Sequence, residues 1–125
     1  MPVSLKGRMY AAMQLIDRDV LYHHDRAKFL RPRLNELTGG GVDFDHFLKA
    51  TVREEYLRVI RKGGCPADAH MTAVMAGNYA VTEWNNRGSR GRVCINSPHE
   101  LKRWEKAGEA EADAVHAQYV NLIKT

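Results

Sequence analysis

Two cysteine–histidine pairs with the same spacing are the residues of this chain best suited to bind a metal. The pairs are Cys65 with His70 and Cys94 with His99, each reading C-x4-H. Thiolate sulfur and imidazole nitrogen are ligands that zinc prefers, and four of them complete a tetrahedral site. Neither pair has the tight C-x2-C spacing of common zinc sites. The sequence therefore predicts no metal or other cofactor, and a zinc site at these four residues stands as an alternative.

A second polar group consists of the histidines and aspartates at positions 23–25 and 43–46. Such side chains can bind metals or transfer protons. Asp43 is better explained as the N-cap of a helix. His23 and His24 fill the one gap in an apolar stripe, so one of them must lie close to the core. We expect that residue to be a packed, hydrogen-bonded histidine and not a metal ligand.

Two segments of the chain combine arginine with an aromatic residue. One segment covers residues 84–92 and contains Trp84. The other covers residues 26–33, contains Phe29 and also holds Arg26 and Lys28. The guanidinium fork binds phosphate or carboxylate groups, and a glycine-containing backbone can approach an anionic surface closely. The residues predicted to bind a partner are Arg87, Arg90, Arg92, Trp84, Arg31 and Arg33.

The sequence lacks the motifs typical of nucleophilic catalysis and nucleotide binding. There is no G-x-S-x-G motif, and neither cysteine stands in the sequence context of a cysteine protease. The glycines at 39–41 follow no strand and precede no Lys-Ser or Lys-Thr pair, so they match neither a P-loop nor a dinucleotide fingerprint. We therefore predict a protein without enzymatic activity.

Apolar residues recur at steps of three and four along most of the chain, which is typical of amphipathic helices. The first predicted helix covers residues 5–37. Pro32 should kink or break it, because proline removes a backbone donor and clashes with the previous turn. The second helix begins after Asp43 and ends at Gly63-Gly64. Its basic residues, Arg53 among them, lie mostly off its apolar face.

Two further helices follow. Pro66 suits the first position of the third helix, which should end at Asn85-Asn86. Its predicted apolar face consists of Met71, Val74, Met75, Asn78, Val81 and Thr82. A basic irregular loop is expected at 86–96, and Ser97-Pro98 marks the start of the fourth helix. The predicted fold is all-α, a compact bundle of about four helices.

Length and composition limit the class of protein. The chain has 125 residues, of which 44% are hydrophobic and 27% charged, as in globular domains. This length predicts a single helical domain over residues 1–125. The N-terminal residues form no apolar signal core, and no apolar run is long enough to cross a bilayer. The two cysteines form no disulfide framework, which predicts reduced thiols in the cytoplasm.

The net charge of +4 favours an anionic partner. The leading hypothesis is a non-enzymatic binding or regulatory protein. Its partner would be a protein or nucleoprotein complex that presents an acidic or phosphate-bearing surface. The length and the lack of modular motifs are typical of small accessory proteins of phages or mobile elements that inhibit a host complex. The alternative is direct binding of DNA or RNA, for which no helix-turn-helix, zinc-finger or RNA-recognition signature is present.

Overall fold

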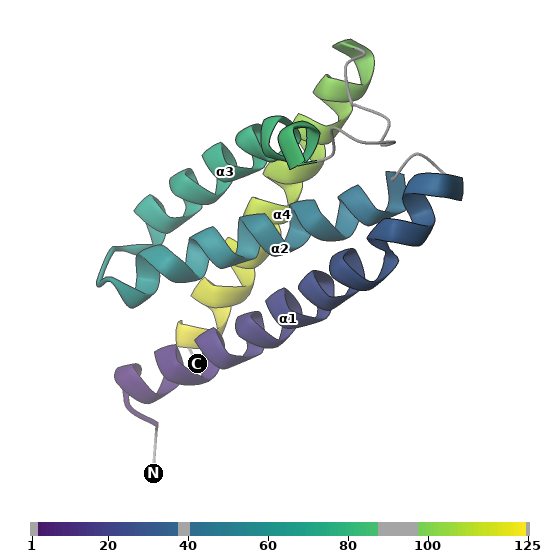
Figure 1. The fold of residues 1–125 in the computed structure, drawn as a ribbon. Coiled ribbons are helices and arrows are strands. Elements are labelled where there is room, and N and C mark those ends of the chain that lie inside the picture. Colours follow the sequence, from purple (N-terminus) through teal and green to yellow (C-terminus); the bar gives the residue numbers. More distant parts are fainter. Residues whose placement is uncertain (1–2, 38–40, 88–97, 125) are drawn as a thin grey trace.

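The computed structural model describes residues 3–37, 41–87 and 98–124 of the chain, and within these ranges it leaves the side chains of 28–37, 41–43, 81 and 83–87 undescribed. Four helices account for almost all of the described residues. They are α1 (Leu5–Leu37), α2 (Gly41–Arg61), α3 (Pro66–Arg87) and α4 (Pro98–Lys124). The prediction of an all-α bundle of about four helices is confirmed (Figure 1).

Local signals explain where α2 ends and α3 begins. Gly63 has a φ of +87°, and its amide donates to the carbonyl of Ile60, while the amide of Gly64 donates to the carbonyl of Val59. This is the Schellman arrangement, in which a left-handed glycine closes the helix. Pro66 then opens α3 as predicted, and the Cys65 sulfur accepts the amide of the first-turn residue Asp68 at 3.5 Å.

Two predicted boundaries are wrong by about half a turn of helix. Because α2 begins at Gly41, Asp43 lies inside its first turn and is not the N-cap. Because α3 continues to Arg87, the predicted loop at 86–96 overlaps the helix by two residues, and the rest of it lies outside the described residues. Boundaries are set by the last backbone hydrogen bonds, which propensity alone does not fix.

Pro32 bends α1 but does not end it. The helix is continuous from Leu5 to Leu37, so the predicted break is absent and the predicted kink is the outcome. Figure 1 shows the axis of α1 turning over its last turns. A proline at this position leaves one carbonyl of the previous turn without its helical partner and pushes that turn away, which bends the axis.

The helices run alternately up and down, with α2 and α4 at the centre (Figure 1). Each of these two contacts all three other helices, whereas α1 and α3 make no contact with each other within the described residues. The buried hydrophobic side chains form one cluster. The largest fully buried side chains are Tyr56, Tyr119, Phe44, Ile16, Leu48, Leu57, Val52 and Val115. No described helix is both long enough and apolar enough to span a membrane.

The predicted apolar face of α3 is confirmed at Val74, which packs against the core, and wrong at most of its other positions. The side chain of Val81 lies outside the described residues. Met71 and Met75 are 63% and 50% exposed, and Asn78 and Thr82 are also exposed. The buried positions of α3 instead hold the small residues Ala69, Ala73, Gly77 and Ala80. A Cβ atom placed on Gly77 would lie only 3.2 Å from the Cα of Gly108 in α4. The close approach of these two backbones requires small residues between them, so the large side chains of α3 face outward.

Candidate partner-binding surface

The predicted binding residues that fall on helices lie near the ends of α1 and α3. Arg31 and Arg33 are in the last two turns of α1, and Trp84 and Arg87 are in the last turn of α3. Because α1 and α3 run in the same direction, these helix ends lie at the same end of the bundle (Figure 1). We call this end, defined by those four positions, the basic end.

Two further predicted residues, Arg90 and Arg92, lie outside the described residues. In sequence they fall between the end of α3 and the start of α4. Cys94 also lies outside the described residues. The assignment of the two arginines to partner binding therefore stays a prediction.

The two histidines of the C-x4-H pairs lie far apart. The Nε2 atom of His70 lies 2.7 Å from the Oδ1 atom of Asp113 in α4. His99 is in the first turn of the same helix, about four turns or about 21 Å before Asp113. Two ligands of one zinc ion must each lie about 2 Å from it. Across the described part of the chain, no three His, Cys, Asp or Glu side chains are grouped to hold a metal ion.

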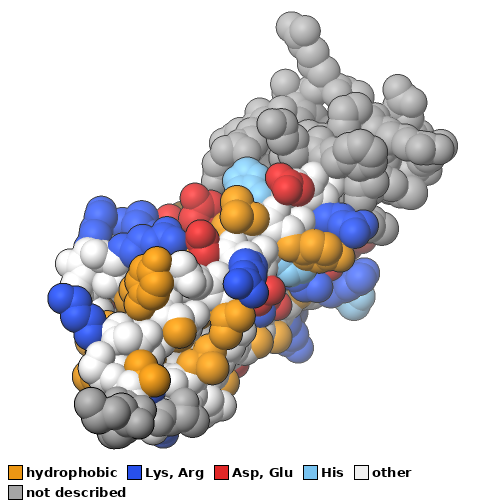
Figure 2. All heavy atoms as spheres, turned by 90° about the horizontal axis from the view of Figure 1, so that it is seen from below, with side chains coloured by type: hydrophobic (Ala, Val, Ile, Leu, Met, Phe, Trp, Pro, Cys, Tyr) orange, Lys and Arg blue, Asp and Glu red, His pale blue; other side chains and the backbone are white. Residues whose placement is uncertain are grey.

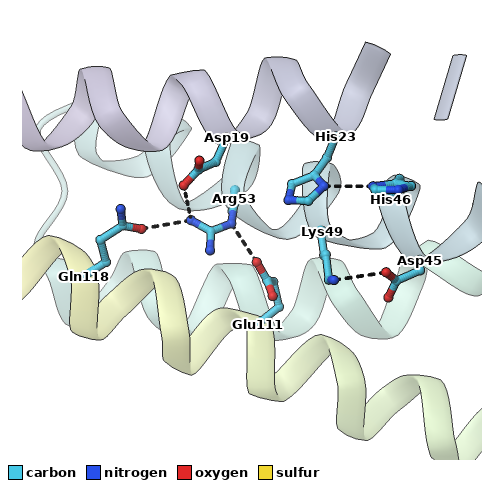
Figure 3. A network of polar contacts seen from close by, with 8 residues as sticks. All are labelled: Asp19, His23, Asp45, His46, Lys49, Arg53, Glu111 and Gln118. Carbon is cyan, nitrogen blue, oxygen red and sulfur yellow. Dashed lines mark hydrogen bonds and ion pairs between the residues drawn. The ribbon is translucent and has the colours of Figure 1, made fainter. Parts of the chain in front are cut away.

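A pair of histidines joins α1 to α2. The Nδ1 atoms of His23 and His46 are 2.9 Å apart, and the planes of the two rings are inclined by 33° (Figure 3). One ring must donate its Nδ1 proton and the other must accept it with a lone pair. His23 is half-buried and His24 is exposed, so the prediction that one of the adjacent histidines packs near the core with a hydrogen bond is confirmed.

Burial lowers the pKa of both rings of this pair. Desolvation is the main cause at His23, where the second ring and the cations Lys49 and Arg53 lower the pKa further and Glu111 opposes them. Desolvation also dominates at His46, where Asp45 raises the pKa and Lys49 and Arg26 lower it. The folded chain therefore holds the pair with fewer protons than two free histidines would carry.

Acid is expected to destabilise the fold through this pair. Both folded pKa values lie below the value of 6.5 for a free histidine, so the unfolded chain binds protons that the folded chain does not. Stability should be complete above about pH 7 and fall as the pH drops below 6.5 toward the folded values. The measurement is the urea midpoint of unfolding at several pH values.

The variant with both His23→Asn and His46→Asn should lose stability less steeply with acid than the natural chain. His116, whose pKa is also lowered by burial, should supply the remaining slope. The matched control is His24→Asn at the exposed neighbouring position, which should keep the original slope. An unchanged slope in the double variant would show that the pair does not couple stability to pH.

An exposed aromatic side chain lies beside the histidine pair. The ring of Tyr22, 51% exposed, meets His23 edge-on at 5.1 Å and His46 at 6.1 Å between ring centroids. The guanidinium of Arg26 lies 4.8 Å from the centre of the Tyr22 ring. We call Tyr22, His23, Arg26 and His46 the Tyr22 cluster. It combines an exposed ring with an exposed cation, just before the last turns of α1.

Sequence reasoning placed Arg26 in a basic segment and His23 and His46 in one polar group, but it missed Tyr22. The spacing of Tyr22 and Arg26 by four residues was an available signal, because side chains at this spacing meet on a helix. The contribution of His46 depends on how α2 packs against α1, and no local pattern contains that information.

Arg53 links three helices and is not available to a partner. Its Nε atom donates to Glu111 at 2.6 Å, and its Nη1 atom lies 3.2 Å from Asp19 and 3.0 Å from Gln118 (Figure 3). Its side chain is 12% exposed. The expectation that Arg53 lies off the buried face is therefore wrong. The guanidinium occupies the junction of α1, α2 and α4, where three acceptors compensate for its burial.

Another set of polar side chains, Tyr56, His70 and His116, lies among α2, α3 and α4. The hydroxyl of Tyr56 is 2.9 Å from the Nδ1 atom of His116, and the His116 ring lies 4.7 Å from the ring of His70. Burial raises the pKa of Tyr56, so this phenol is neutral and can donate to the imidazole. The buried hydroxyl of Tyr119 makes no hydrogen bond within the described part of the chain. The hydrogen bond between Tyr56 and His116 connects α2 to α4.

A hollow of about 300 Å³ lies along α1 and α2. It is lined by His24, Ala27, Phe47, Ala50, Thr51, Glu54 and Glu55. Among the described lining residues, the charged side chains are the two glutamates, and Glu55 forms an ion pair with Arg58 at 2.7 Å. Carboxylates repel anions, so this hollow does not suit the anionic partner that the sequence predicts.

Comparison of the chain with models of known protein families, with curated proteins and with solved structures found no match.

Proposed function

We propose that this chain is a non-enzymatic binding protein that contacts an acidic or phosphate-bearing macromolecular surface through its basic end. The observation that carries the proposal is the convergence of two helix ends. Arg31 and Arg33 on α1 come to the same end of the bundle as Trp84 and Arg87 on α3. Positions far apart in the sequence thus lie at one end of the bundle.

The chemistry of this end suits an anionic partner. Arginine binds phosphate and carboxylate in a bidentate manner, and arginine and tryptophan are the residues most enriched among binding hot spots. The Tyr22 cluster extends the same chemistry along α1 with an exposed ring and the Arg26 guanidinium. Of the nearby acids, Asp45 is already paired with Lys49 at 3.0 Å.

In this proposal the protein acts by occupying the surface of its partner. A cytoplasmic protein or nucleoprotein complex is the expected target, and its inhibition or modulation is the expected result. The proposed type is the small accessory protein of a phage or mobile element. Binding energy concentrated in a few arginines and one tryptophan would let a domain of this size engage a larger complex.

The triple variant Arg87→Ala, Arg90→Ala, Arg92→Ala is expected to keep the fold and lose partner capture from lysate at least tenfold. Three guanidinium groups leave the proposed contact, and truncation of one hot-spot side chain alone costs about 2 kcal/mol or more. The measurement is quantitative pull-down of partners, with and without nuclease. Circular dichroism and thermal melting report on the fold.

The matched control removes the same charge from the opposite end of the bundle. Arg58, Arg61 and Lys62 at the end of α2 are exposed, so their replacement by alanine also lowers the charge by three. The control variant should capture partners normally. Equal losses in both variants would indicate a general charge effect, and unchanged capture in the first would remove these arginines from the mechanism. Capture that disappears with nuclease would favour direct nucleic-acid binding, whose affinity should fall steeply with salt.

A further inference from the structure

The outward face of α3 carries large apolar side chains that nothing in the described structure covers. Met71, Met75 and Tyr79 are 63%, 50% and 66% exposed. They are spaced by four residues, so they form a continuous ridge along one side of the helix. We call these three residues the α3 ridge. A helix normally buries its large apolar side chains, whereas α3 exposes these three and buries alanines and a glycine.

The α3 ridge also lies in the longest segment of the chain without a formal charge. Residues 69–82 contain no Asp, Glu, Lys or Arg, although such residues make up 27% of the chain. The one histidine in this segment, His70, is bonded to Asp113. On the face shown in Figure 2, by contrast, hydrophobic side chains are interspersed with basic and acidic ones.

No other described helix can cover the α3 ridge within the monomer. α3 packs on α2 and α4 through its small residues and Val74, and α1 makes no contact with α3 within the described residues. The ridge therefore faces away from the bundle. Three large side chains exposed in a row without a charge are typical of an interaction surface.

We propose that a second copy of this chain covers the α3 ridge, with the two α3 helices packed antiparallel about a twofold axis near Met75. Met75 of each copy then meets Met75 of the other, and Met71 meets Tyr79 of the second copy. Because the residues are evenly spaced around Met75, the ridge is complementary to itself under this symmetry, as a twofold interface requires.

Charge is compatible with a second copy on the α3 ridge and disfavours a polyanion. The chain carries a net charge of +4, so two copies repel each other wherever basic surfaces meet. The α3 ridge is a surface on which they can meet without facing like charges. A polyanion, by contrast, would find no cation there. Antiparallel packing also sets the positive end of each helix dipole beside the negative end of the other.

The size of the surface sets the expected strength. The uncharged segment is about 21 Å long, and a helix with its side chains is about 10 Å wide. This footprint is smaller than the roughly 800 Å² per partner that stable complexes bury. The dimer should therefore dissociate in the micromolar range or above, and its population should depend on protein concentration.

The test is sedimentation velocity of the purified chain from about 1 to about 500 µM, a range that spans the expected dissociation constant. The mass should rise from the 14.2 kDa of one chain to twice that value. Met75→Lys places two ammonium groups at the twofold axis and should leave the chain monomeric throughout. The matched control is Leu21→Lys, which replaces a side chain of α1 that is 58% exposed, and this variant should still dimerise.

A cross-link provides a second readout. In a background with Cys65→Ser and Cys94→Ser, Met75→Cys should form an intermolecular disulfide on mild oxidation, and Leu21→Cys should not. A chain that stays monomeric at all concentrations would overturn the proposal, as would equal behaviour of the Met75 and Leu21 variants. Capture of a different protein by a monomeric chain through Met75 would overturn it too. None of these outcomes depends on the proposed function of the basic end.

Discussion

Replacement of Gly108 by leucine is expected to lower the free energy of unfolding by about 3 kcal/mol. A Cβ atom at this position would lie 3.2 Å from the Cα of Gly77 and 3.5 Å from the Cδ1 atom of Leu48. The first of these neighbours is backbone, which cannot rotate away. The remaining atoms of leucine would force α3 and α4 apart and disturb the buried contacts on both sides.

The sign of this effect is informative because leucine is the better helix former. Outside a close contact, replacing a helical glycine by leucine should stabilise the helix by about 0.8 kcal/mol. The measurement is urea unfolding followed by circular dichroism. The matched control is Ala110→Leu, at an exposed position two residues along α4, which should leave the midpoint nearly unchanged. Stabilisation by Gly108→Leu would contradict the close approach of α3 and α4.

Arg53→Ala is expected to destabilise the fold by about 2 to 3 kcal/mol. The change removes one guanidinium from three acceptors and leaves Glu111, whose side chain is only 14% exposed, without its cation. A carboxylate in such surroundings loses most of its hydration and gains nothing in return. Urea unfolding at pH 7 measures the loss.

A double replacement distinguishes this explanation from simple loss of packing. Arg53→Met combined with Glu111→Leu removes both charges and keeps apolar volume, so it should recover most of the stability. The control is Arg58→Ala on the same helix, because Arg58 is exposed and its ion pair with Glu55 is solvated, and no measurable change is expected. If the double variant is less stable than Arg53→Ala, the unpaired carboxylate is not the cause.

The sequence predicted those parts of the fold that depend on neighbouring residues. Gly63 ends α2, Pro66 begins α3 and Pro98 begins α4, each through a conformational preference that acts within one turn. The apolar face of α3 depends on a different kind of information. Hydrophobic periodicity predicts that Met71 and Met75 are buried. In the structure, the buried side of α3 is instead the one that packs against Gly108 of α4. That pairing is set by the packing of two helices distant in sequence.

The same distinction applies to the candidate site. Residue type alone identified arginines suited to an anionic partner, and the alternation of helix direction explains why Arg31 and Arg87 come to one end. Residue type placed His23 and His46 in one polar group, but it did not predict the hydrogen bond between them. It also did not identify Arg53 as a buried link, because both contacts depend on the register between helices. The roles of Arg90 and Arg92 remain predictions from residue type.

The small buried face of α3 has a consequence for how mutations would reveal its importance. Truncation to alanine, the usual scan for important residues, changes nothing at Ala69, Ala73 and Ala80, since they are already alanine. α2, which supplies large buried residues such as Phe44 and Tyr56, would show strong effects in the same scan. A scan that replaces each residue by a larger one should instead show strong losses of stability in α3, because its buried side chains have little room for additional atoms.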